Sequence, residues 1–138
     1  MRIDPETLKG QLRERGLRVT EPRVAVLGYL ASTDRHPTAE EVETAVNADG
    51  PVLSRASVYN VLHSLSRVGL VAGMSVQDGP ARYDAHVAPH HHLVCRSCSR
   101  VEDVAWGDFG VAERGVLPDG MAVRTLSLTL DGLCTDCE

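Results

Sequence analysis

Four cysteines stand in two closely spaced pairs, Cys95 with Cys98 and Cys134 with Cys137, and the chain has no others. Each C-x2-C pair can turn two thiolates towards one ion, and together the pairs supply the four soft ligands of a structural zinc site. Two disulfides, a redox-active pair and an iron–sulfur cluster are the alternatives. The amino terminus lacks the apolar stretch of a signal peptide, so we expect a cytoplasmic protein, in which thiols stay reduced. The pairing therefore favours zinc, held between the first pair and the carboxyl terminus.

A second set of possible ligands consists of imidazoles and carboxylates. His90 and His92 are two residues apart, which places both on one face of an extended strand, and Asp103 follows on the next predicted strand. His36, before a predicted helix, and Asp84, at the end of a predicted hairpin, would complete a site between the two halves of the chain. Nitrogen and oxygen ligands without sulfur suit iron(II) or manganese(II) as well as zinc.

Taken singly, these residues have ordinary interpretations. His36 is typical of a turn before a helix cap, and Asp84 of a surface carboxylate. We assign His63 to a polar helix face and His86 to a hinge, and His91 should point away from its two neighbours. The prediction therefore depends on the five ligands coming together, in which case a metal would favour the arrangement that it binds best.

The elements that must position these ligands change type near the middle of the chain. Capping side chains and glycines predict four helices in the first half. The first follows Asp4 and ends before Gly16, the second starts at Thr20, the third runs from Thr38 to about Asn47, and the fourth from Ser54 to about Val68. Residues 70–76 and 81–84, with a turn at 77–80, predict a β-hairpin after them.

The fourth predicted helix has one apolar side and one polar side. The polar side carries Arg55, Tyr59, Asn60, His63 and Arg67. Arg and Asn read base edges in the major groove, and an aromatic ring can contact a thymine methyl group. A solvated face is the ordinary interpretation of one such helix. Paired helices followed by a hairpin describe a winged helix-turn-helix, which favours DNA.

From His90 onward the sequence predicts short strands, at residues 93–95, 100–104 and 123–130. Residues 105–117 are predicted to hold a helix, although they include three glycines. We therefore expect an α+β protein with a DNA-binding domain over residues 1–84 and a metal-binding domain over residues 85–138, joined by a hinge near residues 85–89.

The charge of the chain is unevenly distributed. The net charge is -5, and residues 1–72 carry nine Lys or Arg and nine Asp or Glu, whereas residues 73–138 carry five and ten. The first half is therefore neutral enough to approach DNA, and the acidic excess lies where carboxylates could serve metals. No apolar run approaches the ~20 residues of a transmembrane helix, so no membrane partner is expected.

With these features together, the chain resembles the ferric uptake regulators, and in particular their peroxide-responsive branch. The matching segments are residues 16–20 with 22–23, 36–41, 57–62 with 69–71, 82–84, 90–98, and the final Cys134 and Cys137. The resemblance implies a homodimeric repressor with an α/β dimerisation domain, zinc on the four cysteines, and iron(II) or manganese(II) on the five other ligands. It adds Arg18, Arg23 and Ser57 to Arg55, Tyr59 and Asn60 as expected DNA contacts.

The peroxide-responsive branch implies a chemical signal. Iron(II) in such a site reacts with hydrogen peroxide, and the oxidant attacks a ligand histidine, here His36 or His90. An oxidised imidazole binds metal poorly, so repression of oxidative-stress genes such as catalase would end, whereas manganese(II) would resist the reaction. Asp84 favours this branch, because iron sensors of the family usually carry Glu there. Residues 124–127 lack the histidine that the family usually has on its last strand.

Three other interpretations remain open. An iron- or zinc-responsive repressor of the same family would sense metal occupancy and ignore peroxide. A metallohydrolase would use His90, His92 and Asp84, but no nucleophile or base motif accompanies them. A zinc-stabilised adaptor would bind protein through the fourth helix and show no salt-dependent affinity for DNA. We therefore expect a regulator and not an enzyme, with a pseudo-palindromic operator and peroxide as its signal.

Overall fold

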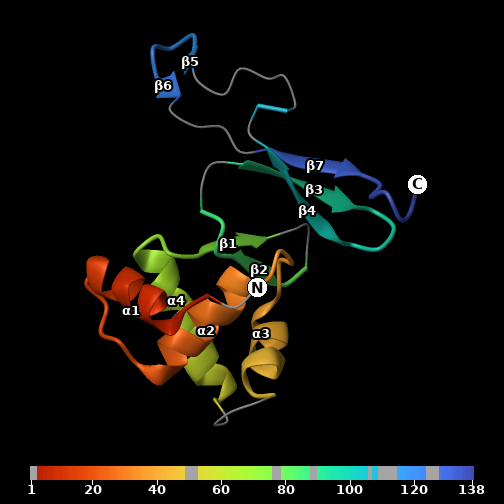
Figure 1. Cartoon of the computed structure of the whole chain (residues 1–138). Coiled ribbons are helices and arrows are strands. Elements are labelled where there is room, and N and C mark those ends of the chain that lie inside the picture. Colours follow the sequence, from red (N-terminus) through yellow and green to blue (C-terminus); the bar gives the residue numbers. More distant parts are fainter. Residues whose placement is uncertain are drawn as a thin grey trace. The chain divides into compact units, whose positions relative to one another are not determined.

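The computed structural model describes residues 3–48, 53–75, 79–87, 90–105, 107–108, 115–123 and 128–138. The chain divides into two compact units, Met1–Val87 and Ala88–Glu138, and each is described by itself. Within the described residues, four helices precede seven short strands, as the α+β prediction requires (Figure 1). No helix in this part of the chain is both long and apolar enough to span a membrane.

The helices begin at the four predicted capping residues. They are α1 (Pro5–Glu14), α2 (Glu21–Ser32), α3 (Ala39–Val46) and α4 (Arg55–Arg67). The side chains of Asp4, Thr20, Thr38 and Ser54 each accept a backbone N–H of the first turn, which satisfies a donor that has no partner inside the helix. The helix prediction is confirmed at these starts.

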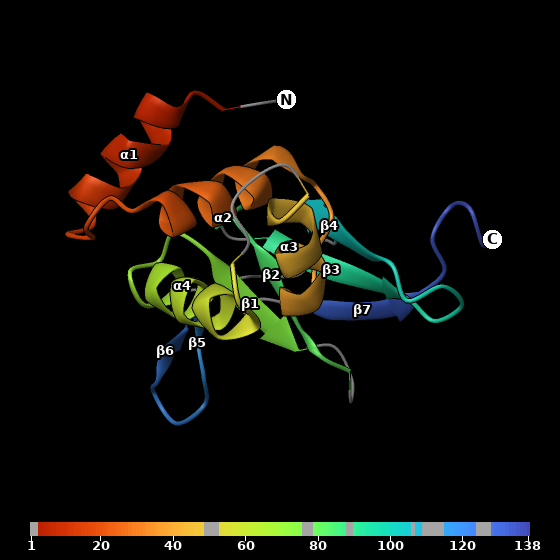
Figure 2. The same cartoon turned by 90° about the horizontal axis from the view of Figure 1, so that it is seen from below.

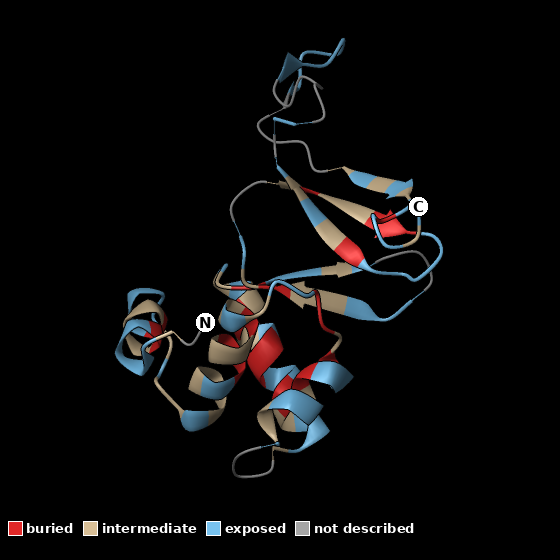
Figure 3. Ribbon diagram, turned by 45° about the vertical axis from the view of Figure 1, so that its right-hand side comes forward, coloured by how far each residue is buried: buried red, intermediate tan, exposed pale blue. Residues whose placement is uncertain are grey.

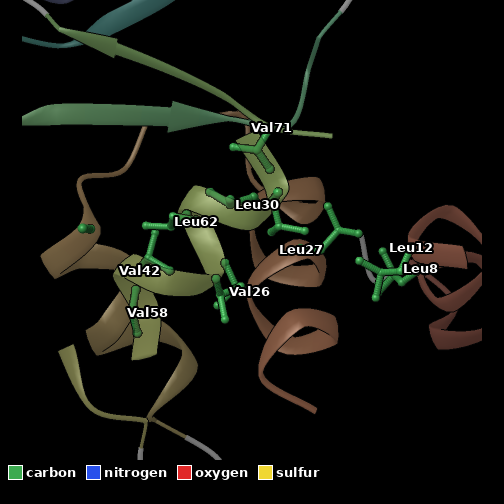
Figure 4. Close-up of a cluster of buried hydrophobic side chains, with 12 residues drawn as sticks. Leu8, Leu12, Val26, Leu27, Leu30, Val42, Val58, Leu62 and Val71 are labelled. Carbon is green, nitrogen blue, oxygen red and sulfur yellow. The ribbon is translucent and has the colours of Figure 1, made fainter. Parts of the chain in front are cut away.

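The core of the first unit consists of leucines and valines from all four helices. Leu12, Val26, Val42, Val58 and Leu65 are each 0% exposed. Figure 4 shows members of this cluster between α2, α3 and α4, with those of α1 beside α2. Figure 2 gives a second view of these helices, and Figure 3 shows that their buried residues lie on inward faces. Burying one such side chain contributes about 1.5–3 kcal/mol.

A β-hairpin follows the helices. Its strands β1 (Ala72–Ser75) and β2 (Ala81–Asp84) are antiparallel, with Ala72 opposite Asp84. The first strand begins later than predicted, because Val71 is buried in the helical core. Residue 76 of the predicted strand and residues 77–78 of the predicted turn lie outside the described residues. The amide of Tyr83 donates to the carbonyl of Pro37 at 2.9 Å, so the hairpin is fastened to the segment that carries His36.

The second unit contains a three-stranded sheet with the order β4-β3-β7. Strand β3 (His90–Cys95) pairs antiparallel with β4 (Val101–Ala105) and parallel with β7 (Thr129–Gly132). Strand β3 begins at His90, three residues before the predicted start, because the histidines pair with β4 throughout. Figure 1 shows β3 in the middle of this sheet.

A small hairpin replaces part of the predicted helix and part of the predicted last strand. Strands β5 (Gly115–Val116) and β6 (Ala122–Val123) pair antiparallel. The helix predicted for residues 105–117 is wrong at both ends, because Ala105 closes β4 and Gly115 opens β5, and glycine favours helix poorly. Residues 106 and 109–114 of that prediction lie outside the described residues, as do residues 124–127 of the predicted strand.

Candidate metal centres and nucleic-acid interface

The four cysteines meet at one end of the sheet in the second unit. Cys95 ends β3, and Cys98 lies in the turn that leads to β4. Cys134 and Cys137 follow β7, which runs parallel to β3, with Cys95 opposite Gly132. Because β3 and β7 are parallel, both C-x2-C pairs lie at the same end of the sheet. The four Sγ atoms all lie within 4.8 Å of one another.

The spacing of these sulfur atoms fits a tetrahedral metal site. The Sγ atoms of Cys98 and Cys134 are 3.7 Å apart. A tetrahedron with zinc–sulfur bonds of about 2.3 Å has edges of about 3.8 Å, whereas a disulfide bond is about 2.05 Å long. All four cysteines are free thiols. The cluster fits zinc and does not fit the alternative of two disulfides.

The thiols of this cluster differ in pKa. The backbone N–H groups of Cys134 and Cys98 stabilise the Cys95 thiolate and lower its pKa to about 6. A hydrogen bond with Ser97 lowers the pKa of Cys137, but hydrogen bonds with the thiols of Cys134, Cys98 and Cys95 outweigh it and raise this pKa to about 12. Without a cation the cluster therefore retains protons, which a metal must displace.

Two arginines between β3 and β4 form ion pairs with the carboxy-terminal segment, one with β7 and one with the cysteine turn. Arg96 forms a two-point ion pair with Asp131 of β7. Arg100 places Nη2 2.9 Å from Asp136, next to Cys137, and Nη1 3.2 Å from Glu102. No local sequence pattern predicts these two links, because Arg96 and Asp131, like Arg100 and Asp136, are more than 30 residues apart.

The second unit also gathers three of the predicted nitrogen and oxygen ligands. The Nε2 atoms of His90 and His92 are 2.9 Å apart, which confirms that alternate residues of β3 share a face. Asp103 lies opposite His92 in β4. Its Oδ1 atom is 3.2 Å from Nε2 of His90 and 3.5 Å from Nε2 of His92. One carboxylate therefore lies within reach of both imidazoles.

His91 occupies the other face of β3, as the alternation predicts. Its side chain is 0% exposed, and its Nδ1 atom accepts the backbone N–H of Leu128 at 2.9 Å. His91 therefore has a structural role next to β7, and leaving it out of the ligand set agrees with this contact.

The first unit brings the other two predicted ligands together. Nε2 of His36 is 3.4 Å from Oδ2 of Asp84, and the two side chains are only 1% and 10% exposed. The other carboxylate oxygen of Asp84 accepts the backbone N–H of His86 at 2.8 Å. Arg82 donates from Nη1 to the carbonyl of His36 at 2.8 Å. We call His36 and Asp84 the half-site of the first unit. His90, His92 and Asp103 form the half-site of the second unit.

The predicted DNA contacts form two neighbouring groups on the first unit. Arg18 and Arg23 line one surface depression together with Ser57 and Asn60. Arg55 and Tyr59 line another, which also includes residues 80–81 at the start of β2. The exposed side of α4 thus faces the start of α2 on one flank and the β-hairpin on the other. The structure places all six predicted residues around α4.

Arg55 has a partner that the sequence did not reveal. Its Nε donates to Oε2 of Glu43 in α3 at 2.8 Å, and its Nη2 lies 4.0 Å from Oε1 of Glu40. The hydrogen bond and the charge of Glu43 raise the pKa of Arg55. Glu43 and Arg55 are 12 residues apart on different helices, so no helical periodicity relates them.

Helices followed by small sheets, with a thiolate cluster and two imidazole–carboxylate half-sites, define an α+β protein with ligands for metals. The chain belongs to the ferric uptake regulator family, whose model matches residues 14–130. It is 32% identical over 130 residues to the peroxide-responsive repressor PerR of Staphylococcus aureus (strain Mu50 / ATCC 700699), covering 92% of this chain and 86% of that protein.

Solved structures of the same family share the fold. The ferric uptake regulator from Pseudomonas aeruginosa with manganese has a TM-score of 0.77 and 30% identity, covering 93% of this chain and 98% of that one. The Campylobacter jejuni peroxide stress regulator has a TM-score of 0.69 and 26% identity, covering 96% of this chain and 97% of that one. The chain is therefore a metal-responsive regulator of this family, with peroxide-responsive relatives.

Proposed function

We propose that this regulator is a DNA-binding repressor that senses hydrogen peroxide through oxidation of a ligand histidine. The observation that carries the proposal is the chemistry of the two half-sites. His36 and Asp84 pair in one unit, and Asp103 lies against His90 and His92 in the other, with no sulfur among these five residues. Two aspartates and three imidazoles suit iron(II) and manganese(II). The S. aureus relative named for its peroxide response supports the same choice.

The zinc and the regulatory metal have different tasks in this proposal. Zinc on Cys95, Cys98, Cys134 and Cys137 holds the carboxyl terminus to β3 and β4, because its ligands all belong to the second unit. The regulatory metal has ligands in both units and would hold them in one arrangement. A metal with a higher affinity for that arrangement shifts the equilibrium constant between the two arrangements by at most the ratio of the two affinities.

The first unit supplies the DNA contacts. Helices α3 and α4 with the β1–β2 hairpin act as a winged helix-turn-helix, with α4 in the major groove. Arg18, Arg23, Arg55, Ser57, Tyr59 and Asn60 are the proposed contacts. A homodimer formed through the second unit presents two such helices, so its operator is pseudo-palindromic.

Iron(II), when bound at the regulatory site, would activate hydrogen peroxide, so that one peroxide oxygen is transferred to a ligand imidazole, which is oxidised, and the other leaves as water. His36 and His90 belong to different half-sites, and oxidation of either ring removes a nitrogen ligand. Its loss weakens the attachment of one unit to the metal, and DNA is released. Control of oxidative-stress genes such as catalase follows from this signal.

The test compares two metal forms of the zinc-loaded protein, prepared without oxygen. The probe is duplex DNA selected from a randomised pool by the manganese(II) form, and DNA affinity is measured before and after brief exposure to peroxide. We expect only the iron(II) form to lose affinity, with a mass gain of one oxygen on a peptide that contains His36 or His90. Retention of DNA by both forms, with unmodified histidines, would instead establish a sensor of metal occupancy.

A further inference from the structure

The ion pair between Arg55 and Glu43 fixes one end of an otherwise exposed side chain. Arg55 is 59% exposed, whereas Glu43 is only 24% exposed. The bond between them joins Nε of Arg55 to Oε2 of Glu43 at 2.8 Å. Glu43 thus holds the Nε side of the guanidinium of a side chain that is otherwise largely exposed.

This bond determines which part of the guanidinium remains for another partner. Arginine presents its N–H donors in a rigid, planar fork. Glu43 uses the Nε donor and leaves the terminal fork on Nη1 and Nη2 outside this bond. The nearest carboxylate oxygen of Glu40 is 4.0 Å from Nη2, which is too long for a hydrogen bond. Two parallel donors match the O6 and N7 acceptors of guanine in the major groove.

The position of Arg55 suits base contact. Arg55 is the first residue of α4, and residues at the amino-terminal end of a recognition helix contact base edges. It lines a depression with Tyr59, one turn along the helix, and with Pro80 and Ala81 of the hairpin. A fixed fork loses less side-chain freedom on binding than a free arginine does.

We infer that Glu43 is a positioning residue that orients Arg55 so that its terminal N–H fork reads a guanine of the DNA site. This inference rests on the proposed DNA-binding function and deepens it. It assigns the base that Arg55 recognises and gives Glu43, which no DNA phosphate would attract, a role at the interface.

The experiment selects duplex DNA from a randomised pool with the zinc- and manganese(II)-loaded protein and compares four variants, Arg55→Ala, Arg55→Lys, Glu43→Ala and Glu40→Ala. Glu40→Ala is the matched control, because it removes the same charge from the same helix one turn away, at a side chain that is 76% exposed. Both glutamate variants remove one negative charge from α3, but only Glu43→Ala removes the hydrogen bond to Arg55, so a difference in base preference between them reports positioning. Zinc content and circular dichroism verify that each variant is folded.

The wild-type protein should prefer G·C over A·T by about tenfold or more at one position in each half of the palindromic DNA site. Arg55→Ala should reduce that preference to about twofold or less, because alanine has no donor, and Arg55→Lys should keep only part of it, because an ammonium can contact O6 and N7 but lacks the planar fork. Glu43→Ala should lose most of the preference, and Glu40→Ala should keep it.

Three results would overturn the inference, and each has its own meaning. If Arg55→Ala weakens binding equally for every sequence, Arg55 contacts phosphate. An unchanged guanine preference in Arg55→Ala would show that another residue reads the base, and equal behaviour of the two glutamate variants would remove the role of Glu43. Failure of the wild-type protein to select any sequence would contradict the proposed function itself.

Discussion

At the scale of single residues, Asp103 is the group most central to the half-site of the second unit. Its Oδ1 lies within 3.5 Å of both imidazoles. Asp103→Asn removes the negative charge but keeps the shape, so we expect manganese(II) affinity to fall by at least about tenfold. Calorimetric titration of the zinc-loaded protein measures this change. Asp108→Asn, an equal charge change at an exposed position, is the control, and equal affinities in the two variants would contradict the assignment.

The cysteines support a second prediction at this scale. Near neutral pH the Cys95 thiol, with a pKa of about 6, is already ionised, whereas Cys137, with a pKa of about 12, keeps its proton. Zinc binds thiolates, so zinc uptake must release at least the Cys137 proton. Titrations in two buffers with different ionisation enthalpies count the released protons. A binding enthalpy that does not depend on the buffer would show that the metal-free thiols are already ionised.

At the scale of elements, the cap of α3 connects helix stability to a half-site. The Thr38 hydroxyl accepts the backbone N–H of Glu41 at 3.2 Å, and Thr38 also forms a bridge with Arg82 of β2. Thr38→Ala should destabilise the first unit by about 1 kcal/mol, measured by urea unfolding. Manganese(II) affinity should fall as well, because Thr38 lies two residues after His36. Thr38→Ser keeps the capping oxygen and should restore both the stability of the first unit and the manganese(II) affinity. A Ser variant as unstable as the Ala variant would contradict the capping role of Thr38.

Loss of the ion pairs that Arg100 forms between β4 and the carboxyl terminus should have only a small effect on zinc release. Arg100 contacts Glu102 and Asp136, but all three side chains are largely exposed, and exposed ion pairs contribute only about 0–1 kcal/mol. Arg100→Ala should therefore speed zinc release to a chelator by about two- to fivefold at low salt, and the difference should vanish at high salt. Arg67→Ala, on the exposed side of α4, is the control. A difference that persists at high salt would mean that Arg100 acts through packing.

Prediction from the sequence succeeded where the signal is local. Helix starts follow from a capping side chain and its own first turn, as at Thr38, and the shared face of His90 and His92 follows from strand alternation. It failed where pairing with a distant segment decides the structure. Gly115 pairs with Val123 in a hairpin instead of joining a helix, and Glu43 meets Arg55 only because α3 packs against α4.

The proposed regulation of the whole protein depends on one metal acting on two units. The first unit contains the proposed DNA contacts and one half-site, and the second contains the other half-site and the zinc cluster. Coupling between metal and DNA is reciprocal, so a metal that increases DNA affinity is itself bound more tightly in the presence of DNA.

The most direct test of this claim is the DNA affinity of the zinc-loaded protein with and without manganese(II), measured on duplex selected by the manganese(II) form. We predict that manganese(II) increases this affinity by about tenfold or more in the wild-type protein. The increase should disappear both in Asp84→Asn, which alters the first unit, and in Asp103→Asn, which alters the second. Equal DNA affinity with and without manganese(II) in the wild-type protein would contradict a regulatory metal that joins the two half-sites.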